Sequence, residues 1–395
     1  MSYQNGLKRN ITLYYIAEFL AELVFLMPIF IAFQKQYISF SQMSLLAASR
    51  YAITLLLELP TGAFADLAGR KLSTALGLVL QSVGLILIAV TPGAQSIIIG
   101  TLIRAVGESF MSGSSTALIY DTLKELGRSH DFSKVMSTQT FVTQWAIIIG
   151  TVSGGYLYAF NHSLPYLLWG ITNAVSAVLY LCIQEPHIDS EKFTFTSYIN
   201  QARLGFKELL KSSYSRNLTA YYSLVGGISW SWQVYFNLIY VASIGYSEIT
   251  QGWILSFVRM INSLVIVRLL SLNHLITKKR VFFFFPTVMI AAVVMLALPV
   301  PVLPLLAIFG MTIPSTLRFV LLDRYTNEVL ESKYRAAALS SLNMLVGIVY
   351  VLFVVASGPL LDHYPVQLIF FISGALTLFL VVPQAIRLTQ RINQS

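Results

Sequence analysis

The most informative segment of the chain reads Glu58-Leu59-Pro60-Thr61-Gly62-Ala63-Phe64-Ala65-Asp66-Leu67-Ala68-Gly69-Arg70-Lys71. It joins two long apolar segments through a short charged turn. Gly62 lets two helices approach closely, and Gly69 supplies a turn that no side chain obstructs. Asp66 stands where it can cap a helix or pair with an arginine, and Arg70 and Lys71 begin the next segment on the cytoplasmic side. The stretch therefore predicts a tight turn at the edge of a membrane.

The composition of the whole chain is that of a multi-pass membrane protein. Of its 395 residues, 56% are hydrophobic and 11% are charged, whereas about a quarter of a soluble domain is charged. The formal net charge of +9 then reports membrane topology, and we expect no nucleic-acid partner. Cys182 is the single cysteine, which excludes a disulfide framework and a metal–thiolate cluster. The polar first ten residues precede an apolar run of spanning length, so we expect no cleavable signal peptide.

Apolar runs of about 20 residues, the length that crosses a bilayer as a helix, recur along the chain. Gly, Pro, Asn and Ser mark most of the breaks between them. Twelve such runs are predicted, at residues 11–34, 43–64, 72–91, 95–120, 135–159, 164–183, 218–242, 250–272, 281–299, 302–323, 336–357 and 365–384.

The basic residues orient these runs. Twenty of the 26 Lys and Arg residues fall on one predicted side, Lys35 falls on the other, and five lie within the apolar runs. Because cytoplasmic loops carry the excess of Lys and Arg, both termini are expected in the cytoplasm. An even number of spans agrees with this asymmetry, and we expect a multi-pass protein of the plasma (inner) membrane.

The longest polar stretch, residues 184–217, divides the chain into an N-terminal part, 1–183, and a C-terminal part, 218–395. Within the stretch, residues 198–214 interleave apolar with basic side chains. This pattern predicts an amphipathic helix on the cytoplasmic surface, with a solvated linker as the alternative.

The two parts also repeat each other at an offset of about two hundred residues. Asp121 corresponds to Asp323, and Lys134 corresponds to Arg335. Each match is weak alone, but together they indicate two six-helix halves related by duplication.

The opening stretch resembles the signature loop between the second and third helices of major facilitator superfamily transporters, a pattern that reads roughly G-x-[LF]-A-D-x-x-G-R-[RK]. The matching residues are Gly62, Phe64, Ala65, Asp66, Gly69, Arg70 and Lys71. The resemblance implies an all-α membrane protein with twelve transmembrane helices in two pseudo-symmetric six-helix bundles that rock about a central site. It covers the whole chain at the level of architecture and is specific only at this loop. Within the superfamily, the chain looks most like a bacterial drug exporter.

Ionisable residues inside the predicted helices are costly, so they usually face an aqueous cavity or a partner. They are Glu18, Glu22, Arg50, Glu58, Arg104, Glu108, Arg259, Arg268 and Arg318. All of them lie in helices that the resemblance assigns to the central cavity.

A cluster of Glu22, Arg104 and Glu108 is our hypothesis for proton coupling, with Glu18 one turn from Glu22 on the same face. A rise of about 1.5 Å per residue puts Glu22 and Glu108 both near mid-membrane. One carboxylate would stay ionised beside Arg104, and the other would carry a proton. A purely structural ion pair is the alternative.

The resemblance further implies a cytoplasmic gate, in which Asp66 latches to the other half of the protein. The gate residues are Glu58, Gly62, Asp66, Gly69, Arg70, Lys71 and Asp121. For the substrate cavity, helical spacing and side-chain chemistry select Trp232, Gln233, Phe236, Arg259 and Asn343. The run from Gly150 to Gly155 partly matches the glycine-rich motif of drug antiporters, and a close helix crossing explains it equally well.

The sequence contains no P-loop, no nucleotide-binding domain and no metal-ligand spacing, so it excludes an ATP-driven pump and predicts no cofactor and no enzymatic activity. The first functional hypothesis is a proton-coupled antiporter that exports amphipathic or cationic compounds. The second is a proton symporter that imports a small metabolite, for which Arg104 and Arg259 are anion anchors. The third is a non-transporting receptor or assembly partner of the same fold. Expected partners are a small-molecule substrate, protons and the lipid bilayer, and we expect a monomer.

Overall fold

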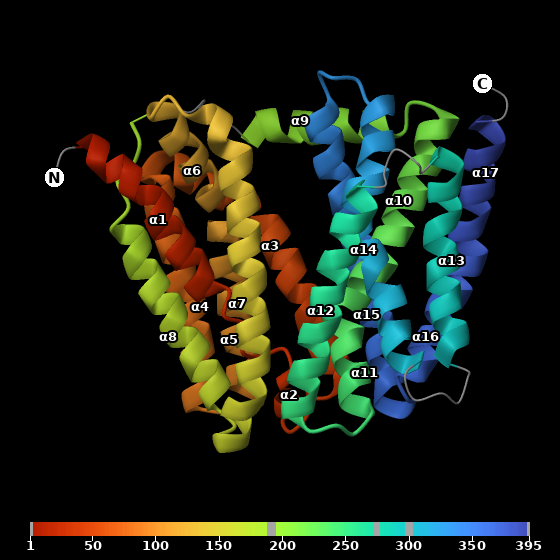
Figure 1. The fold of residues 1–395 in the computed structure, drawn as a ribbon, viewed down its shortest axis with the longest axis horizontal. Helices are drawn as coiled ribbons and strands as arrows, with labels where there is room; N and C mark the ends of the chain where they lie inside the picture. Colours follow the sequence, from red (N-terminus) through yellow and green to blue (C-terminus); the bar gives the residue numbers. More distant parts are fainter. Residues whose placement is uncertain (1–2, 188–194, 272–276, 297–302, 393–395) are drawn as a thin grey trace. The chain divides into compact units, whose positions relative to one another are not determined.

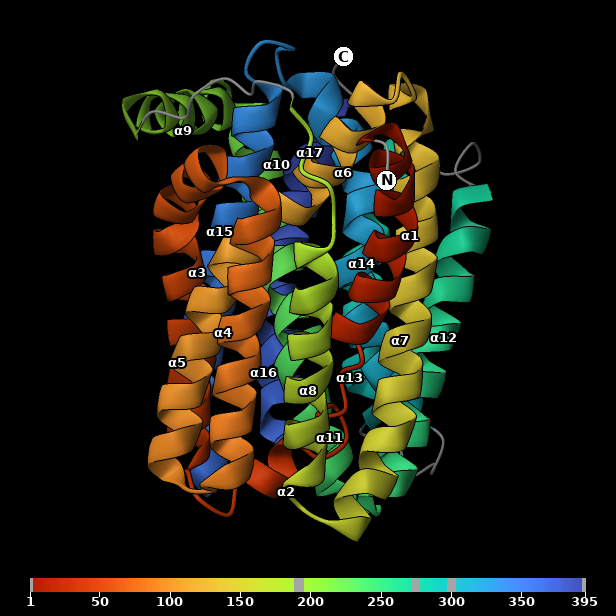
Figure 2. The same ribbon diagram turned by 90° about the vertical axis from the view of Figure 1, so that its left-hand side faces the viewer.

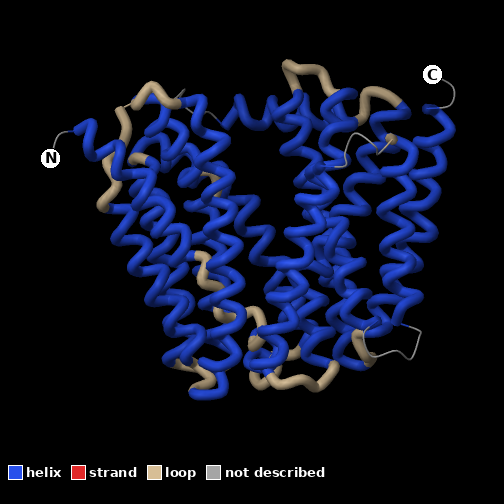
Figure 3. The backbone as a smooth tube through the Cα atoms, viewed as in Figure 1, coloured by secondary structure: helices blue, strands red, loops and turns tan. Residues whose placement is uncertain are grey.

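The computed structural model describes residues 3–187, 195–271, 277–296 and 303–392. Every regular element in these ranges is a helix (Figure 3). Seven helices within them are long and apolar enough to cross a membrane. The prediction of an all-α membrane protein is therefore confirmed.

The chain forms two compact units, and each is described here by itself. The first unit comprises Met1–Ser39, Leu46–Phe195 and Tyr246–Ser256, and the second comprises Phe40–Leu45, Thr196–Gly245 and Phe257–Ser395. Helices α3 and α12 thus each contribute residues to both units.

A carboxylate of the second unit binds the first turn of α3, which belongs to the same unit. Asp362 accepts hydrogen bonds from the backbone N–H groups of Phe40 (2.8 Å) and Ser41 (3.1 Å). A carboxylate at a helix N-terminus fills unpaired donors and complements the helix dipole.

The helices of the first unit pack mainly along their lengths (Figure 2). They are α1 (Tyr3–Ala21), α2 (Phe30–Gln34), α3 (Phe40–Ala68), α4 (Arg70–Val90), α5 (Ala94–Met111), α6 (Ser114–Glu125), η1 (Ser129–Asp131), α7 (Phe132–Phe160) and α8 (Leu164–Leu181). Glycines let α4 and α5 approach closely, since a Cβ atom on Gly77 would lie 2.5 Å from the carbonyl oxygen of Gly107.

Two predicted apolar runs of this unit are interrupted. The run 11–34 breaks after Ala21, whose carbonyl accepts a hydrogen bond (2.8 Å) from the indole of Trp169, and Pro28 offers no backbone donor within the break. The run 95–120 breaks at Gly113, which has a φ of 76°. Hydropathy does not reveal these breaks because tertiary contacts and backbone conformation set them.

The second unit consists of helices that run beside one another, with one helix lying across their ends (Figure 1). They are α9 (Phe195–Leu209), α10 (Ser213–Ser231), η2 (Trp232–Phe236), α11 (Asn237–Ser243), α12 (Glu248–Ser271), α13 (Lys278–Leu296), α14 (Leu303–Val329), α15 (Arg335–His363), α16 (Gln367–Leu376), η4 (Thr377–Val381) and α17 (Val382–Ile392). Both η2 and η4 are single turns of π-helix that join α-helices on either side.

Helix α9 docks onto the second unit, so this part of the linker is not merely solvated. A Cβ atom on Gly205 would lie 2.5 Å from the carbonyl oxygen of Ala337, and Ser341 donates a hydrogen bond to the carbonyl of Ala202 (3.4 Å). Glu208 accepts the backbone N–H of Glu331 (2.8 Å) and an ion pair from Lys211 (2.5 Å).

Candidate functional site

The stretch 58–71 is more helical than predicted. Helix α3 continues through Asp66 to Ala68, and α4 begins at Arg70. The turn is the single residue Gly69, whose φ of 101° lies in the region that favours glycine. The role predicted for Gly69 thus matches its backbone conformation.

The basic residues after Gly69 bind to neighbouring helices of the first unit. Arg70 forms an ion pair with Asp121 and donates to the carbonyl of Ala117 (3.0 Å). The Nζ atom of Lys71 donates to the carbonyls of Leu181 (3.4 Å) and Ile183 (3.1 Å), on either side of the exposed Cys182. These contacts tie the start of α4 to the ends of α6 and α8.

Sequence reasoning missed Glu185 as a member of this arrangement. Its two carboxylate oxygens accept the backbone N–H groups of Arg70 (2.7 Å) and Lys71 (3.1 Å). Glu185 therefore caps the N-terminus of α4, a role that we had considered for Asp66. An acid placed directly before Pro186 at the end of an apolar run was the available signal.

Three other predicted gate residues make none of these contacts. Glu58 and Asp66 are exposed, and no ion pair joins either of them to a residue that the structure describes. A Cβ atom on Gly62 would meet no described atom within 4 Å, so the predicted close approach of two helices at Gly62 is corrected.

Glu18 is the most enclosed acid of the predicted proton cluster. Its side chain is 8% exposed and lies beside the apolar core of α1, α7 and α8. The hydroxyl of Tyr180 donates to one carboxylate oxygen (2.5 Å), and the amide of Gln139 donates to the other (3.3 Å). Across the described ranges, no Lys or Arg forms an ion pair with Glu18.

Glu108 and Arg104, two members of the predicted proton-coupling cluster, each contact a residue of another helix. Glu108 accepts from Arg50 of α3 (2.7 Å), and Arg104 instead lies over the ring of Trp169, 4.6 Å from its centroid. Arg104 is 8% exposed, and its Nε–H group donates no hydrogen bond to any residue that the structure describes. Residues one turn apart on one helix are neighbours, but here the closer partner comes from another helix.

The third member of that predicted cluster, Glu22, lies at the break after α1, where the backbone is no longer regular. Glycines of α7 pack against this break. A Cβ atom would lie 2.6 Å from the nitrogen of Val24 if added to Gly150, and 2.0 Å from the carbonyl oxygen of Phe25 if added to Gly154. The glycine-rich run thus serves close packing, which was one of its two expected explanations.

Two predicted cavity residues of the second unit belong to its interior. Trp232 and Phe236 are 0% exposed. The indole of Trp232 donates to Ser373 (2.8 Å) and its ring contacts Phe370, while Phe236 contacts Phe353. The expectation that these two rings line a cavity is therefore corrected.

Their neighbour Gln233 lies on a different face and is partly exposed. Its amide donates to Thr316 of α14 (3.4 Å). Among the other candidates, Arg259 is partly exposed and Asn343 is exposed. The π turn moves Gln233 away from Phe236, because three residues cover a smaller part of a turn in a π-helix than in an α-helix.

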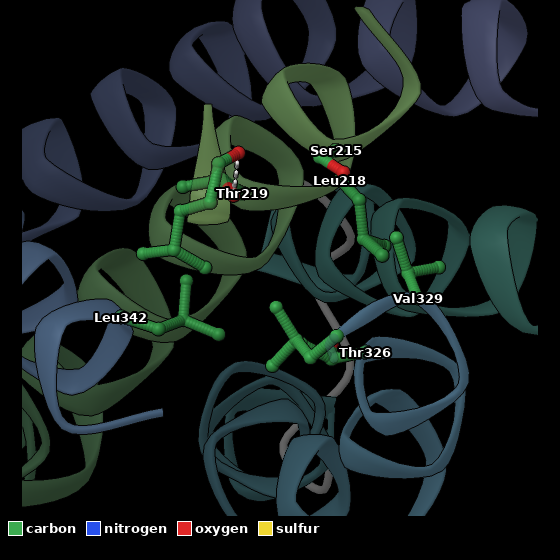
Figure 4. A pocket seen from close by; sticks show the side chains of 8 residues that line it. Ser215, Leu218, Thr219, Thr326, Val329 and Leu342 are labelled. Atoms are coloured by element: carbon green, nitrogen blue, oxygen red, sulfur yellow. Dashed lines mark hydrogen bonds between the residues drawn. The ribbon is translucent and has the colours of Figure 1, made fainter. Parts of the chain in front are cut away.

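A small and mainly apolar pocket lies among α9, α10, α14 and α15 (Figure 4). It is lined by Leu209, Ser215, Leu218, Thr219, Thr326, Val329, Leu330 and Leu342. The Thr219 hydroxyl donates to the carbonyl of Leu209 (3.3 Å), so the polar groups here serve the local backbone. None of the predicted substrate residues lines this pocket.

Comparison with known proteins gives consistent results. A family model described as Major Facilitator Superfamily matches residues 11–328. The chain is 31% identical over 144 residues to "Uncharacterized MFS-type transporter YxaM" of Bacillus subtilis (strain 168), and the match spans 36% of this chain and 35%, about a third, of that protein.

Solved structures extend the likeness over nearly the whole chain. A variant of the nucleoside transporter NupG matches with a TM-score of 0.78 at 14% identity, covering 97% of this chain and 99% of that one. The POT family transporter PepTSo matches with a TM-score of 0.75 at 11% identity, covering 98% and 99%. At these identities the likeness shows the fold alone.

Proposed function

The chain belongs to the Major Facilitator Superfamily, and we propose that it moves a small polar molecule together with protons. As a member it is a multi-pass membrane protein and a secondary transporter, and it is not an enzyme. The protons, the substrate class and the direction of transport are parts of the proposal.

The burial of Glu18 and its two hydrogen bonds are the observation that supports proton coupling. A carboxyl group enclosed by apolar side chains can bind a proton, and no Lys or Arg of the described ranges forms an ion pair with Glu18 that would oppose this. Its partners Tyr180 and Gln139 are hydrogen-bond donors and suit the ionised form. Protonation of Glu18 removes an acceptor from one of these bonds, which weakens a contact that joins α1 to α7 or α8. A proton can thereby change helix packing.

Glu108 is the weaker proton carrier of the two, because its ion pair with Arg50 favours the ionised carboxylate. We assign Glu108 a structural role and retain Glu22, one turn from Glu18, as a second candidate.

We favour symport of a small polar metabolite over export of amphipathic compounds. Export of such compounds drew its support from aromatic side chains, and two of them, Trp232 and Phe236, pack inside the second unit. Glu18 belongs to the first unit, whereas Gln233 and Arg259 belong to the second. Symport requires a proton and a substrate to be bound at the same time, and we assign Glu18 to the proton and Gln233 and Arg259 to the substrate.

The test uses proteoliposomes with an imposed pH gradient, in which tracer uptake and internal pH are followed together. The wild type is expected to move substrate and protons in the same direction. Glu18→Gln is expected to equilibrate substrate without moving protons, and Asp131→Asn, which changes a partly exposed acid of η1 that pairs with Arg128, is the control. Full coupled transport by Glu18→Gln would contradict the role of Glu18. Opposed fluxes would support antiport, and no flux with any compound would support a receptor.

A further inference from the structure

Amide side chains of the second unit meet two threonines of α14 through Gln233 and Asn262, and Asn237 follows Gln233 by four residues, about one helical turn. We call this set the amide cluster, and it consists of Gln233, Asn237, Asn262, Thr312 and Thr316. We propose that the amide cluster binds an uncharged, polyhydroxylated solute. This inference rests on the proposed transport function, because it names the class of substrate.

Two threonines of α14 accept the amide hydrogen bonds of the cluster. Thr312 and Thr316 are four residues apart on α14 and therefore share a face. The amide of Asn262, from α12, donates to the hydroxyl of Thr312 (3.3 Å). The amide of Gln233, from the π turn, donates to the hydroxyl of Thr316 (3.4 Å). Two different helices thus each place an amide against one face of a third.

The cluster has acceptors that no donor fills. The Oδ1 atoms of Asn237 and Asn262 are buried, and neither accepts a hydrogen bond from any residue in the described ranges. The hydroxyl of Thr312 is engaged, since it donates to the carbonyl of Phe309 (3.3 Å). Leaving a buried acceptor unfilled costs about 1–3 kcal/mol, so a ligand that supplies donors is favoured here.

The charge of the surroundings narrows the class of ligand. The amide cluster contains no carboxylate, and Arg259 precedes Asn262 by three residues on α12, which places both on one face. A nearby guanidinium disfavours a cationic ligand. One N–H group of Gln233 and one of Asn262 donate to the threonines, and the buried atoms of the cluster that have no described partner are both acceptors. Neutral hydroxyl groups are the donors that fit, and several on one molecule can fill both asparagine oxygens.

The test measures binding by the purified full chain in detergent at a fixed pH, without a proton gradient. The probes are a hexose, a pentose, a nucleoside and myo-inositol, compared with a quaternary ammonium compound and a dicarboxylate. At least one neutral probe is expected to raise the apparent Tm and to give a saturable titration. Asn262→Leu and Asn237→Leu are each expected to weaken its affinity by about tenfold, the effect of one lost hydrogen bond in a buried site.

Asn327→Leu is the matched control. Asn327 lies on α14 outside the amide cluster, and its Oδ1 atom is likewise buried without a described donor. We expect the Asn327→Leu variant to bind the neutral probe with an affinity within about twofold of the wild type, as for substitutions away from the site. Two asparagine variants on different helices keep the test decisive if one of them does not fold.

The inference is overturned if no neutral probe binds, or if binding survives in both asparagine variants. It stands, while proton coupling fails, if a neutral probe binds through Asn237 and Asn262 but its transport moves no protons. If transport is coupled to protons but is unchanged in Asn237→Leu and Asn262→Leu, proton coupling stands and the inference fails.

Discussion

At the scale of single residues, Glu185 shows how one carboxylate can organise the end of a helix. It fills two of the unpaired N–H groups at the start of α4, where the helix dipole also favours a negative charge. Replacing a capping residue by alanine typically costs about 0.5–2 kcal/mol. We therefore expect Glu185→Ala to lower the free energy of unfolding by that amount, as measured by unfolding in a graded detergent denaturant.

Asp66→Ala is the control for that measurement. Asp66 is exposed and precedes Gly69 in the same stretch, but it does not cap α4. A change within about 0.5 kcal/mol is expected for Asp66→Ala. Equal destabilisation by both substitutions would show that the cap at Glu185 has no special role.

At the scale of elements, α7 depends on its glycines. Gly154 lies so close to the break after α1 that a Cβ atom would overlap the carbonyl oxygen of Phe25 at 2.0 Å. Gly154→Ala is expected to destabilise the protein by about 1–3 kcal/mol, the usual effect of overpacking. Gly62→Ala is the matched control, because a Cβ atom there meets no described atom within 4 Å. The same denaturation assay compares them, and equal stability of the two variants would refute the close packing of α7.

Helix α9 is the element whose docking responds to pH. Burial alone raises the pKa of Glu208, but the hydrogen bond from Lys211 and the backbone N–H of Glu331 outweigh it and hold that pKa below its ordinary value. A lowered carboxyl pKa stabilises docking above the ordinary value of about 4.3, and this contribution is lost as pH falls through the folded pKa. The protection of the α9 amides against hydrogen exchange, taken relative to the intrinsic rate at each pH, is therefore expected to fall as the pH drops below about 4.

Glu208→Gln serves as the reference in that experiment. It removes the titrating group but keeps a side chain of similar shape, and comparison at each pH cancels the intrinsic pH dependence of exchange. The difference between wild type and variant should be largest near neutral pH and vanish in acid. A difference that does not change with pH would assign the docking of α9 to packing at Gly205 and not to Glu208.

At the scale of the whole molecule, the sequence predicts the helices better than their contacts. Apolar length is a local property, so it locates α4, α8 and α13 to within a few residues. The break after Ala21 depends on the indole of Trp169, which is remote in the sequence. The sequence places Arg104 and Glu108 on one face of a helix, but the guanidinium that pairs with Glu108 is that of Arg50, on another helix.

In the candidate site, too, local sequence features could be predicted and contacts between helices could not. The burial of Glu18 could be expected from a charge within an apolar run, but its partners Tyr180 and Gln139 come from two other helices. Helical spacing placed Gln233 beside Trp232 and Phe236, and the π turn separates them. Periodicity assumes one helix type, so it cannot anticipate a local change in helical repeat.

The position of the single cysteine has a practical consequence for spectroscopy. Cys182 is exposed and stands between the two carbonyl groups that Lys71 binds, three residues before the cap at Glu185. Because the chain contains one cysteine, a thiol-reactive fluorophore labels the native protein at one known point without mutagenesis. Its emission then reports in real time whether the start of α4 stays clamped to the end of α8.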